Sequence, residues 1–131
     1  MPAAASRAAT ATLDLEVSQL RSKKGVLRIC LTTDPKQFPD CSSDAGSVRR
    51  TISAASPRIR FEGLLPGNYA IAVIHDANSN AKLDTMLGIP REGFGFSQNP
   101  AIGFGPPSFT SASFAVGTGA EAQQVRMRYL L

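Results

Sequence analysis

Apolar and polar residues alternate along seven short stretches of the chain, a pattern typical of half-buried β-strands. Leucine and valine alternate with acidic and hydroxyl side chains in residues 12–18 (TLDLEVS), and isoleucine and phenylalanine alternate with charged ones in residues 58–64 (RIRFEGL). Residues 68–75 (NYAIAVIH) are apolar on both faces, which predicts a central, buried strand. The other predicted strands are residues 25–32, 48–53, 111–116 and 123–131.

Turn-forming residues separate these strands, since the chain contains 11 glycines and 9 prolines. No segment between the strands has the apolar spacing of an amphipathic helix, so parallel βαβ units are not expected. Short strands at close spacing predict an all-β fold, a seven-stranded antiparallel β-sandwich of the immunoglobulin-like type. We expect one long ordered loop between residues 75 and 111, and no helix.

The length of 131 residues suggests a single domain. We place it at residues 12–131, after an alanine-rich segment, residues 1–11, that is either a disordered tail or the remnant of a signal peptide. The formal net charge of +4 comes from basic residues spread along the chain, without the dense basic run of a nucleic-acid-binding protein. We expect a monomer with no nucleic-acid partner and no membrane span.

The two cysteines, Cys30 and Cys41, leave two possibilities open. In an exported protein they would form a disulfide that closes a small loop. Alternatively, Cys30 is a buried free thiol in its apolar strand. We expect Phe38, between them, to anchor this loop on the sandwich.

Oxygen-bearing side chains alternate directly after the central strand. The first nine positions of a calcium-binding loop are matched by Asp76, Asn78, Asn80, Lys82 and Asp84, where Lys82 would contribute its backbone carbonyl. Calcium prefers six to eight oxygen ligands, so these residues form a candidate metal site. With only two carboxylates, its affinity should lie at about the millimolar level of extracellular modules.

The calcium pattern departs from that of an EF-hand at two positions. Ala81 stands where that loop has glycine, and Leu87 stands where it has a bidentate glutamate, although Glu92 could complete the ligand set from further along. The alternative is a metal-free loop in which the Asp and Asn side chains bind nearby backbone N–H groups. Both interpretations remain open.

His75 and Asp76, with Ser97 or Ser108 downstream, contain the residue types of a Ser-His-Asp triad. Such a triad is defined by geometry and not by proximity in sequence. We favour a different role for His75, in which its ring nitrogens brace the loop.

The second half of the long loop is rich in glycine, proline and phenylalanine. A connection of this length is usually functional or packed on itself. We favour a self-packed cap and leave open a surface for a ligand or partner. The residues assigned to this loop scaffold are His75, Glu92, Phe94, Phe96 and Phe109.

Three motifs in this region, HDANSNAKLD, GIPREGFGFS and GPPSF, carry a family resemblance. They resemble the signature HDxNxNxxLD, GxPxEGxGFS and GPPxF of a bacterial family catalogued as domain of unknown function family 2141, and residues 61–70 (FEGLLPGNYA) resemble its preceding segment. The resemblance implies an exported, periplasmic or extracellular sandwich similar to transthyretin-like or collagen-adhesin B-type modules. It implies no established activity.

Three functions are compatible with these residues. The first, which we favour, is a non-catalytic binding or structural module for an unknown ligand or protein partner, with calcium in its Asp/Asn loop. The second is a hydrolase-like enzyme that uses His75, Asp76 and a loop serine. The third is recognition of anionic glycans or lipid headgroups by an arginine face, formed by Arg58, Arg60, Arg126 and Arg128.

Overall fold

The computed structural model describes residues 9–41, 47–79, 85–86, 89–90, 92–101 and 107–130. In this part of the chain the fold is all-β apart from one short helix. The elements in chain order are β1 (Ala11–Ser18), β2 (Val26–Thr32), β3 (Ser47–Ser53), β4 (Arg58–Leu64), β5 (Gly67–Asp76), β6 (Thr85–Met86), β7 (Ile89–Pro90), β8 (Gly93–Phe96), α1 (Phe109–Ala112), β9 (Phe114–Val116) and β10 (Gly119–Arg126).

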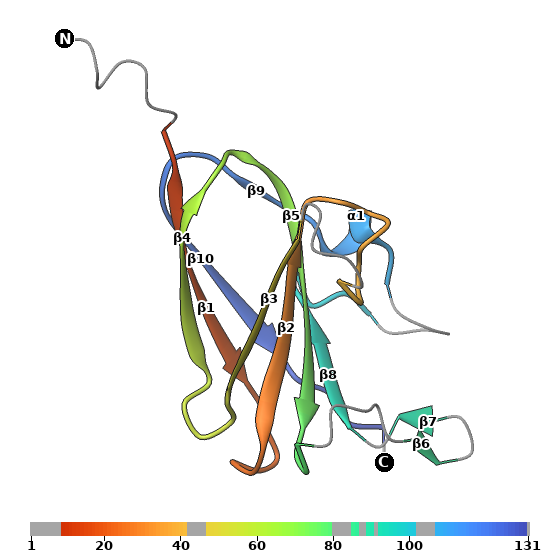
Figure 1. Ribbon diagram of the computed structural model, residues 1–131. Helices are drawn as coiled ribbons and strands as arrows, with labels where there is room; N and C mark the ends of the chain where they lie inside the picture. Colours follow the sequence, from red (N-terminus) through yellow and green to blue (C-terminus); the bar gives the residue numbers. More distant parts are fainter. Residues whose placement is uncertain are drawn as a thin grey trace, which may run out of the picture.

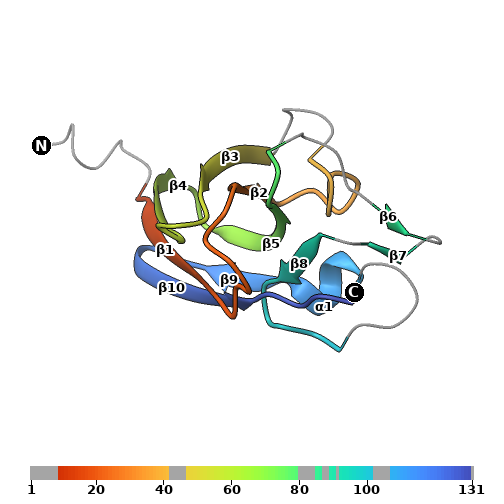
Figure 2. The ribbon, with the colours of Figure 1, turned by 90° about the horizontal axis from the view of Figure 1, so that it is seen from below.

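Two main sheets form the body of the protein (Figure 1). The smaller sheet has the strand order β10-β1-β4. The larger sheet has the order β3-β2-β5-β8, and β9 pairs with the first residues of β5. The short strands β6 and β7 pair with each other and lie apart from both sheets (Figure 2).

The main core lies between the two sheets and follows from the alternation in the strands. Leu13, Leu15 and Val17 of β1 are buried there, and the intervening Asp14 and Glu16 are not. Leucine and isoleucine side chains of β2 and β5 fill the opposite wall. The strand β5 lies between β2 and β8, as expected for the most apolar stretch of the sequence.

The count of seven strands is too low. Each predicted stretch overlaps an observed strand, but the described residues also contain β6, β7 and β8. The strand β8 has the sequence GFGF, and glycine is depleted in ordinary strands, so the sequence pattern predicts a loop here. A Cβ on Gly95 would lie 2.6 Å from Cγ1 of Val125 and 2.9 Å from the Arg126 carbonyl oxygen. Glycine is therefore required where the chain at the end of β10 crosses β8.

The expectation of a purely antiparallel sandwich is also wrong, because β1 and β10 pair in parallel. The strand β9 pairs with the start of β5 and leads directly into β10. As a result, β10 begins where β1 begins, with Gly119 opposite Ala11, and runs in the same direction. Gly119 has a φ of 97°, which allows the chain to turn at this point.

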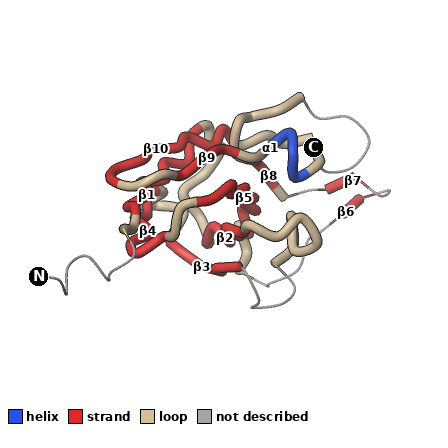
Figure 3. Tube along the Cα trace, turned by 90° about the horizontal axis from the view of Figure 1, so that it is seen from above, coloured by secondary structure: helices blue, strands red, loops and turns tan. Residues whose placement is uncertain are grey.

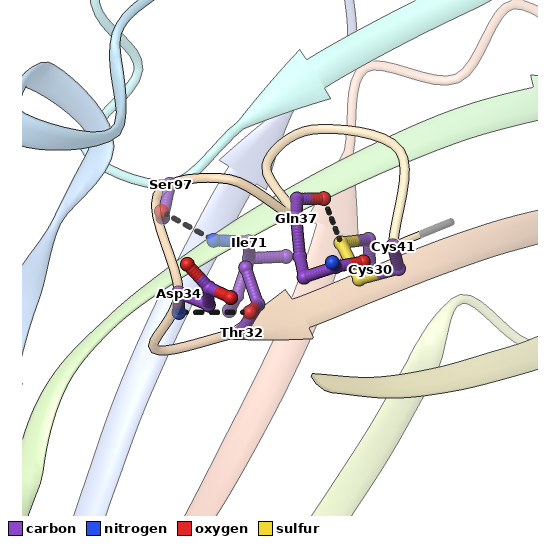
Figure 4. The surroundings of a disulfide bond; sticks show 7 residues. All are labelled: Cys30, Thr32, Asp34, Gln37, Cys41, Ile71 and Ser97. Atoms are coloured by element: carbon purple, nitrogen blue, oxygen red, sulfur yellow. Dashed lines mark hydrogen bonds between the residues drawn. A yellow bond between two sulfur atoms is a disulfide. The ribbon is translucent and has the colours of Figure 1, made fainter. Parts of the chain in front are cut away.

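A second apolar cluster covers the outer face of the larger sheet, the face directed away from the main core. It contains Cys30, Ala72 and Phe96, and Phe38 packs edge-on against the rings of both Phe96 and Phe109. The expected anchoring by Phe38 is therefore observed. A disulfide between Cys30 and Cys41 ties the end of the loop that carries Phe38 to β2 (Figure 4).

The helix α1 is a local exception to the helix-free fold that we expected. It is a single turn (Figure 3), and its first residue, Phe109, packs against the second cluster. The Ser108 side chain accepts a hydrogen bond from the Ser111 N–H, as an N-cap residue does, and Ala112 is buried beneath the turn. A single turn shows no helical periodicity in a sequence. No helix among the described residues has the length and apolarity to cross a bilayer.

Candidate functional site

The Asp/Asn loop leaves the larger sheet at Asp76 and returns to it at Glu92. These two carboxylates are buried, with 1% and 6% of their surface exposed. The Ala77 N–H donates a hydrogen bond of 3.2 Å to Oε2 of Glu92, and the Ser79 N–H donates one to the Asp76 carbonyl. The two ends of the loop are thus held together at the edge of the sheet.

Of the five predicted calcium ligands, Asp76 and Asn78 are described by the structure. Asn80, Lys82 and Asp84 lie outside the described residues. Within the described part of the chain, no group of three or more His, Cys, Asp or Glu side chains is positioned to hold a metal ion. This does not test the predicted site, because amide and backbone oxygens make up much of its ligand set.

Asp76 forms an ion pair with Arg28 on the neighbouring strand β2. Nε of Arg28 lies 2.9 Å from Oδ2 of Asp76, and 37% of the Arg28 side chain is exposed. A buried carboxylate needs a charged or hydrogen-bonding partner, because burial without one is strongly unfavourable. The pair therefore holds both side chains in place on the outer face of the sheet.

Gly25 packs against the backbone of Asp76 and Ala77, where the Asp/Asn loop begins. Its φ is +73°, and a Cβ built on it would lie 2.5 Å from the Ala77 carbonyl oxygen and 2.6 Å from the carbonyl carbon, and also too close to the Asp76 carbonyl. Its carbonyl accepts a hydrogen bond from Ala54 N–H. The chain before β2 thus lies directly against the first residues of the Asp/Asn loop.

His75 is buried, with 2% exposure, and both of its ring nitrogens are hydrogen-bonded. Nε2 lies 2.8 Å from the Lys24 carbonyl oxygen, and Nδ1 lies 2.8 Å from the Tyr129 hydroxyl. A carbonyl only accepts, so Nε2 carries the proton, and in the neutral ring Nδ1 accepts from Tyr129. His75 therefore joins the β1–β2 connection to the last residues of the chain, and its ring bonds neither end of the Asp/Asn loop.

Tyr129 is held from two sides in this contact. The Arg21 guanidinium lies 4.3 Å from the centre of its ring, and the Arg21 N–H donates to its hydroxyl. Burial raises the pKa of the Tyr129 hydroxyl, and the Arg21 N–H and charge act in the opposite direction. A Cβ on Gly93 would overlap this ring, which explains the first glycine of GFGF.

The residues of the possible Ser-His-Asp triad do not meet. Near the start of β5, Ser97 accepts a hydrogen bond of 2.9 Å from the Ile71 N–H (Figure 4). Its hydroxyl also donates to the Ala112 carbonyl. His75 lies at the other end of that strand, and Ser108 caps α1. His75 and Asp76 are consecutive strand residues, so their side chains point to opposite faces.

The phenylalanines of the predicted loop scaffold lie on the outer face of the larger sheet. Phe94 is opposite Ile74 and Phe96 is opposite Ala72 in the β5–β8 register. Phe96 is buried, and Phe94 and Phe109 are partly buried against the same cluster. Glu92, the remaining scaffold residue, lies directly before this strand at the base of the loop.

The family of the chain follows from a match over most of its length. The model of a bacterial family described as "Uncharacterized protein conserved in bacteria (DUF2141)" matches residues 15–124. The chain belongs to this family. No curated protein and no solved structure matches it significantly.

In this member of the uncharacterized bacterial family, two of the four arginines of the predicted face form ion pairs with acidic residues. Arg58 pairs with Glu16 at 2.8 Å, and Arg60 pairs with Asp14 at 2.7 Å, on the outer face of the smaller sheet. The Arg60 hydrogen bond lowers the pKa of Asp14. Arg126 lies beside Ser18 on this sheet, whereas the backbone of Arg128 pairs with that of Phe94 in the larger one.

One feature of the family member was not predicted: a groove of about 760 Å³ on the outer face of the larger sheet. We call it the outer groove. It could have been suspected from Arg28, a charged residue within the apolar stretch VLRICLT. The lining residues that matter below are Arg28, Asp40, Arg49, Arg50, Ala72 and Ile74.

Proposed function

We propose that the protein is a non-catalytic, exported binding module with an immunoglobulin-like or transthyretin-like sandwich, in which calcium orders the Asp/Asn loop. The observation that carries the proposal is the state of His75. Its ring is buried and both nitrogens are engaged by Lys24 and Tyr129. A general base must reach the proton it abstracts, and the ring of His75 bonds no serine among the residues that the structure describes. The disulfide between Cys30 and Cys41 supports export, since such bonds persist in oxidising compartments.

Covalent labelling tests the non-catalytic part. We expect no adduct when the protein is incubated with a fluorophosphonate, a reagent that labels serines activated by a neighbouring base. Intact-mass spectrometry measures the result, and a known serine hydrolase under the same conditions confirms that the reagent is active. Labelling of Ser97 or Ser108 that disappears in His75→Gln would overturn the proposal.

The base of the loop supports the calcium part. Glu92, which the sequence could only suggest as a distant ligand, lies at the point where the loop closes and bonds the Ala77 N–H. Its carboxylate and that of Asp76 are both buried there. Buried carboxylates at the root of an Asp- and Asn-rich loop are the oxygen-rich surroundings that a hard cation prefers.

Thermal unfolding tests the calcium part. With a dissociation constant of about 1 mM, about 10 mM calcium should stabilise the fold by about 1.4 kcal/mol, which raises Tm by about 4 °C over the chelated protein. Asp84→Asn should remove most of this shift, because it removes a carboxylate ligand.

Lys82→Ala is the matched control in the same loop. The predicted ligand at this position is the backbone carbonyl, so the variant should keep the full calcium response. An unchanged Tm in calcium, or equal losses in the two variants, would contradict the proposed site.

A further inference from the structure

Two rows of side chains cross the outer face of the larger sheet and form the outer groove. In the first row, Thr51, Arg28 and Ile74 lie side by side in the strand register. In the second row, the neighbours in the strand register are Arg49, Cys30 and Ala72. Arg28 and Arg49 are therefore diagonal neighbours on one face, about 7–8 Å apart between their backbones.

The lining of the outer groove is strongly cationic. Three arginines, Arg28, Arg49 and Arg50, contribute to it, and Asp40 is the one acidic residue among the described lining residues. The outer face of the smaller sheet carries a second groove, of about 770 Å³, whose lining contains two arginines, Arg58 and Arg60, and two acidic residues, Asp14 and Glu16. The two grooves are therefore similar in volume, and the described lining of the outer groove has the larger excess of basic over acidic residues.

Arg28 is held in place for contact with an anion. Its bond to the buried Asp76 uses Nε, and no other interaction of its guanidinium occurs within the described residues. The terminal amino groups of the guanidinium remain available on a side chain whose orientation is fixed from behind. Such a donor loses little conformational freedom when it binds a carboxylate or phosphate oxygen.

The floor of the outer groove is apolar. Ala72 has a small side chain and Ile74 is half-buried, and the disulfide of Cys30 lies at the end formed by the loop of Asp40. Arg50 folds back along the edge strand, where its Nη1 donates to the Arg49 carbonyl at 2.9 Å. The volume of about 760 Å³ lies within the range of small-molecule sites.

We propose that the outer groove binds a small molecule that carries an oxyanion, a carboxylate or a phosphate ester, on an apolar body. Arg28 and Arg49 contact the oxyanion, and Ala72 and Ile74 contact the apolar part. This inference rests on the proposed function, since it names the ligand class of the binding module.

Titration with matched amphiphiles tests the proposal. Octanoate and octyl phosphate carry the two oxyanions on the same chain, and 1-octanol is their uncharged counterpart. NMR amide chemical shifts follow the titration. At least one of the two anions should bind with a dissociation constant in the millimolar range or tighter and change the amide shifts of residues in β2, β3 and β5. The preferred anion identifies the headgroup chemistry. Octanol should bind at least fivefold more weakly.

Arg49→Gln is the main variant, because Arg49 is exposed and the change leaves Asp76 paired with Arg28. It should weaken anion binding about fivefold or more, as expected for loss of one charge-assisted contact. Arg58→Gln removes the same charge from the other sheet and should change the affinity less than twofold. Arg28→Lys keeps the charge beside Asp76 but loses the planar donor pair, and should also weaken binding.

Three results would overturn the outer-groove proposal. They are binding of octanol as tight as that of the anions, equal weakening by Arg49→Gln and Arg58→Gln, and the absence of shifts in β2, β3 and β5 at millimolar anion. If the serine labelling and the calcium response are then as expected, only the groove assignment fails. A labelled serine would instead remove the proposed function, whatever the titration shows.

Discussion

Gly25→Ala should lower the free energy of unfolding by about 3 kcal/mol, the largest loss expected for any conservative change at the base of the Asp/Asn loop. The new Cβ would overlap the Asp76 carbonyl oxygen and would lie 2.5 Å from the Ala77 carbonyl oxygen, and both are backbone atoms that cannot rotate away. The φ of +73° adds strain for any residue with a side chain. Chemical denaturation of both proteins in calcium-free buffer measures the difference.

Gly63→Ala separates the two contributions. Gly63 has a similar φ of +69°, but a Cβ there meets nothing within 4 Å. This variant should therefore lose only about 1 kcal/mol, the cost of the left-handed backbone conformation alone. Equal losses of unfolding free energy in the two variants would contradict the prediction, because the close approach of Gly25 to Asp76 and Ala77 would then contribute nothing to the effect of the added Cβ.

The strands that face the main core could be predicted because their signal is local. Leu13, Leu15 and Val17 alternate with polar residues, and burial of one face is the physical cause of that pattern. Alternation reports which side chains share a face, but it carries no information on which strand is the neighbour or in which direction it runs. The parallel pairing of β1 with β10 therefore could not be inferred.

The strand β8 was missed for a different reason. Gly93 and Gly95 occupy positions where the ring of Tyr129 and the chain at Val125 leave no room for a Cβ. Their presence is dictated by residues that follow some 30 positions later, so a local pattern identifies them only as turn or loop formers. Glycine is also required where another part of the chain approaches the backbone closely, and such an approach can be recognised only once the fold is known.

The candidate site shows the same division between local and distant information. Asp76 was identified from its place in an alternating run of oxygen ligands, a local signal. Its partner Arg28 and the partner of His75, Tyr129, are separated from them by 48 and 54 residues. No spacing rule connects such residues, and so neither the orientation of Arg28 toward the outer groove nor the structural use of His75 could be derived before the fold was known.

Removal of the disulfide should also have a large effect. The double variant Cys30→Ala/Cys41→Ala should lose about 3 kcal/mol of unfolding free energy, because the cross-link spans 11 residues and restricts the unfolded chain. Alanine is preferred to serine at these buried positions, since it adds no unsatisfied hydroxyl. Urea denaturation of the oxidised wild type and the variant measures the loss.

Reductant provides the matched control for this prediction. Dithiothreitol should bring the wild type close to the stability of the double variant and should leave the variant unchanged. Phe38→Ala removes the ring contacts with Phe96 and Phe109 but keeps the disulfide, so it should destabilise the oxidised protein. Reduction and Phe38→Ala together should lower the free energy of unfolding by less than the sum of their separate effects, because both changes release the same loop. Full additivity would mean that the disulfide and the aromatic contacts act independently, and a loss below about 1 kcal/mol on reduction would show that packing alone holds the loop on the sheet.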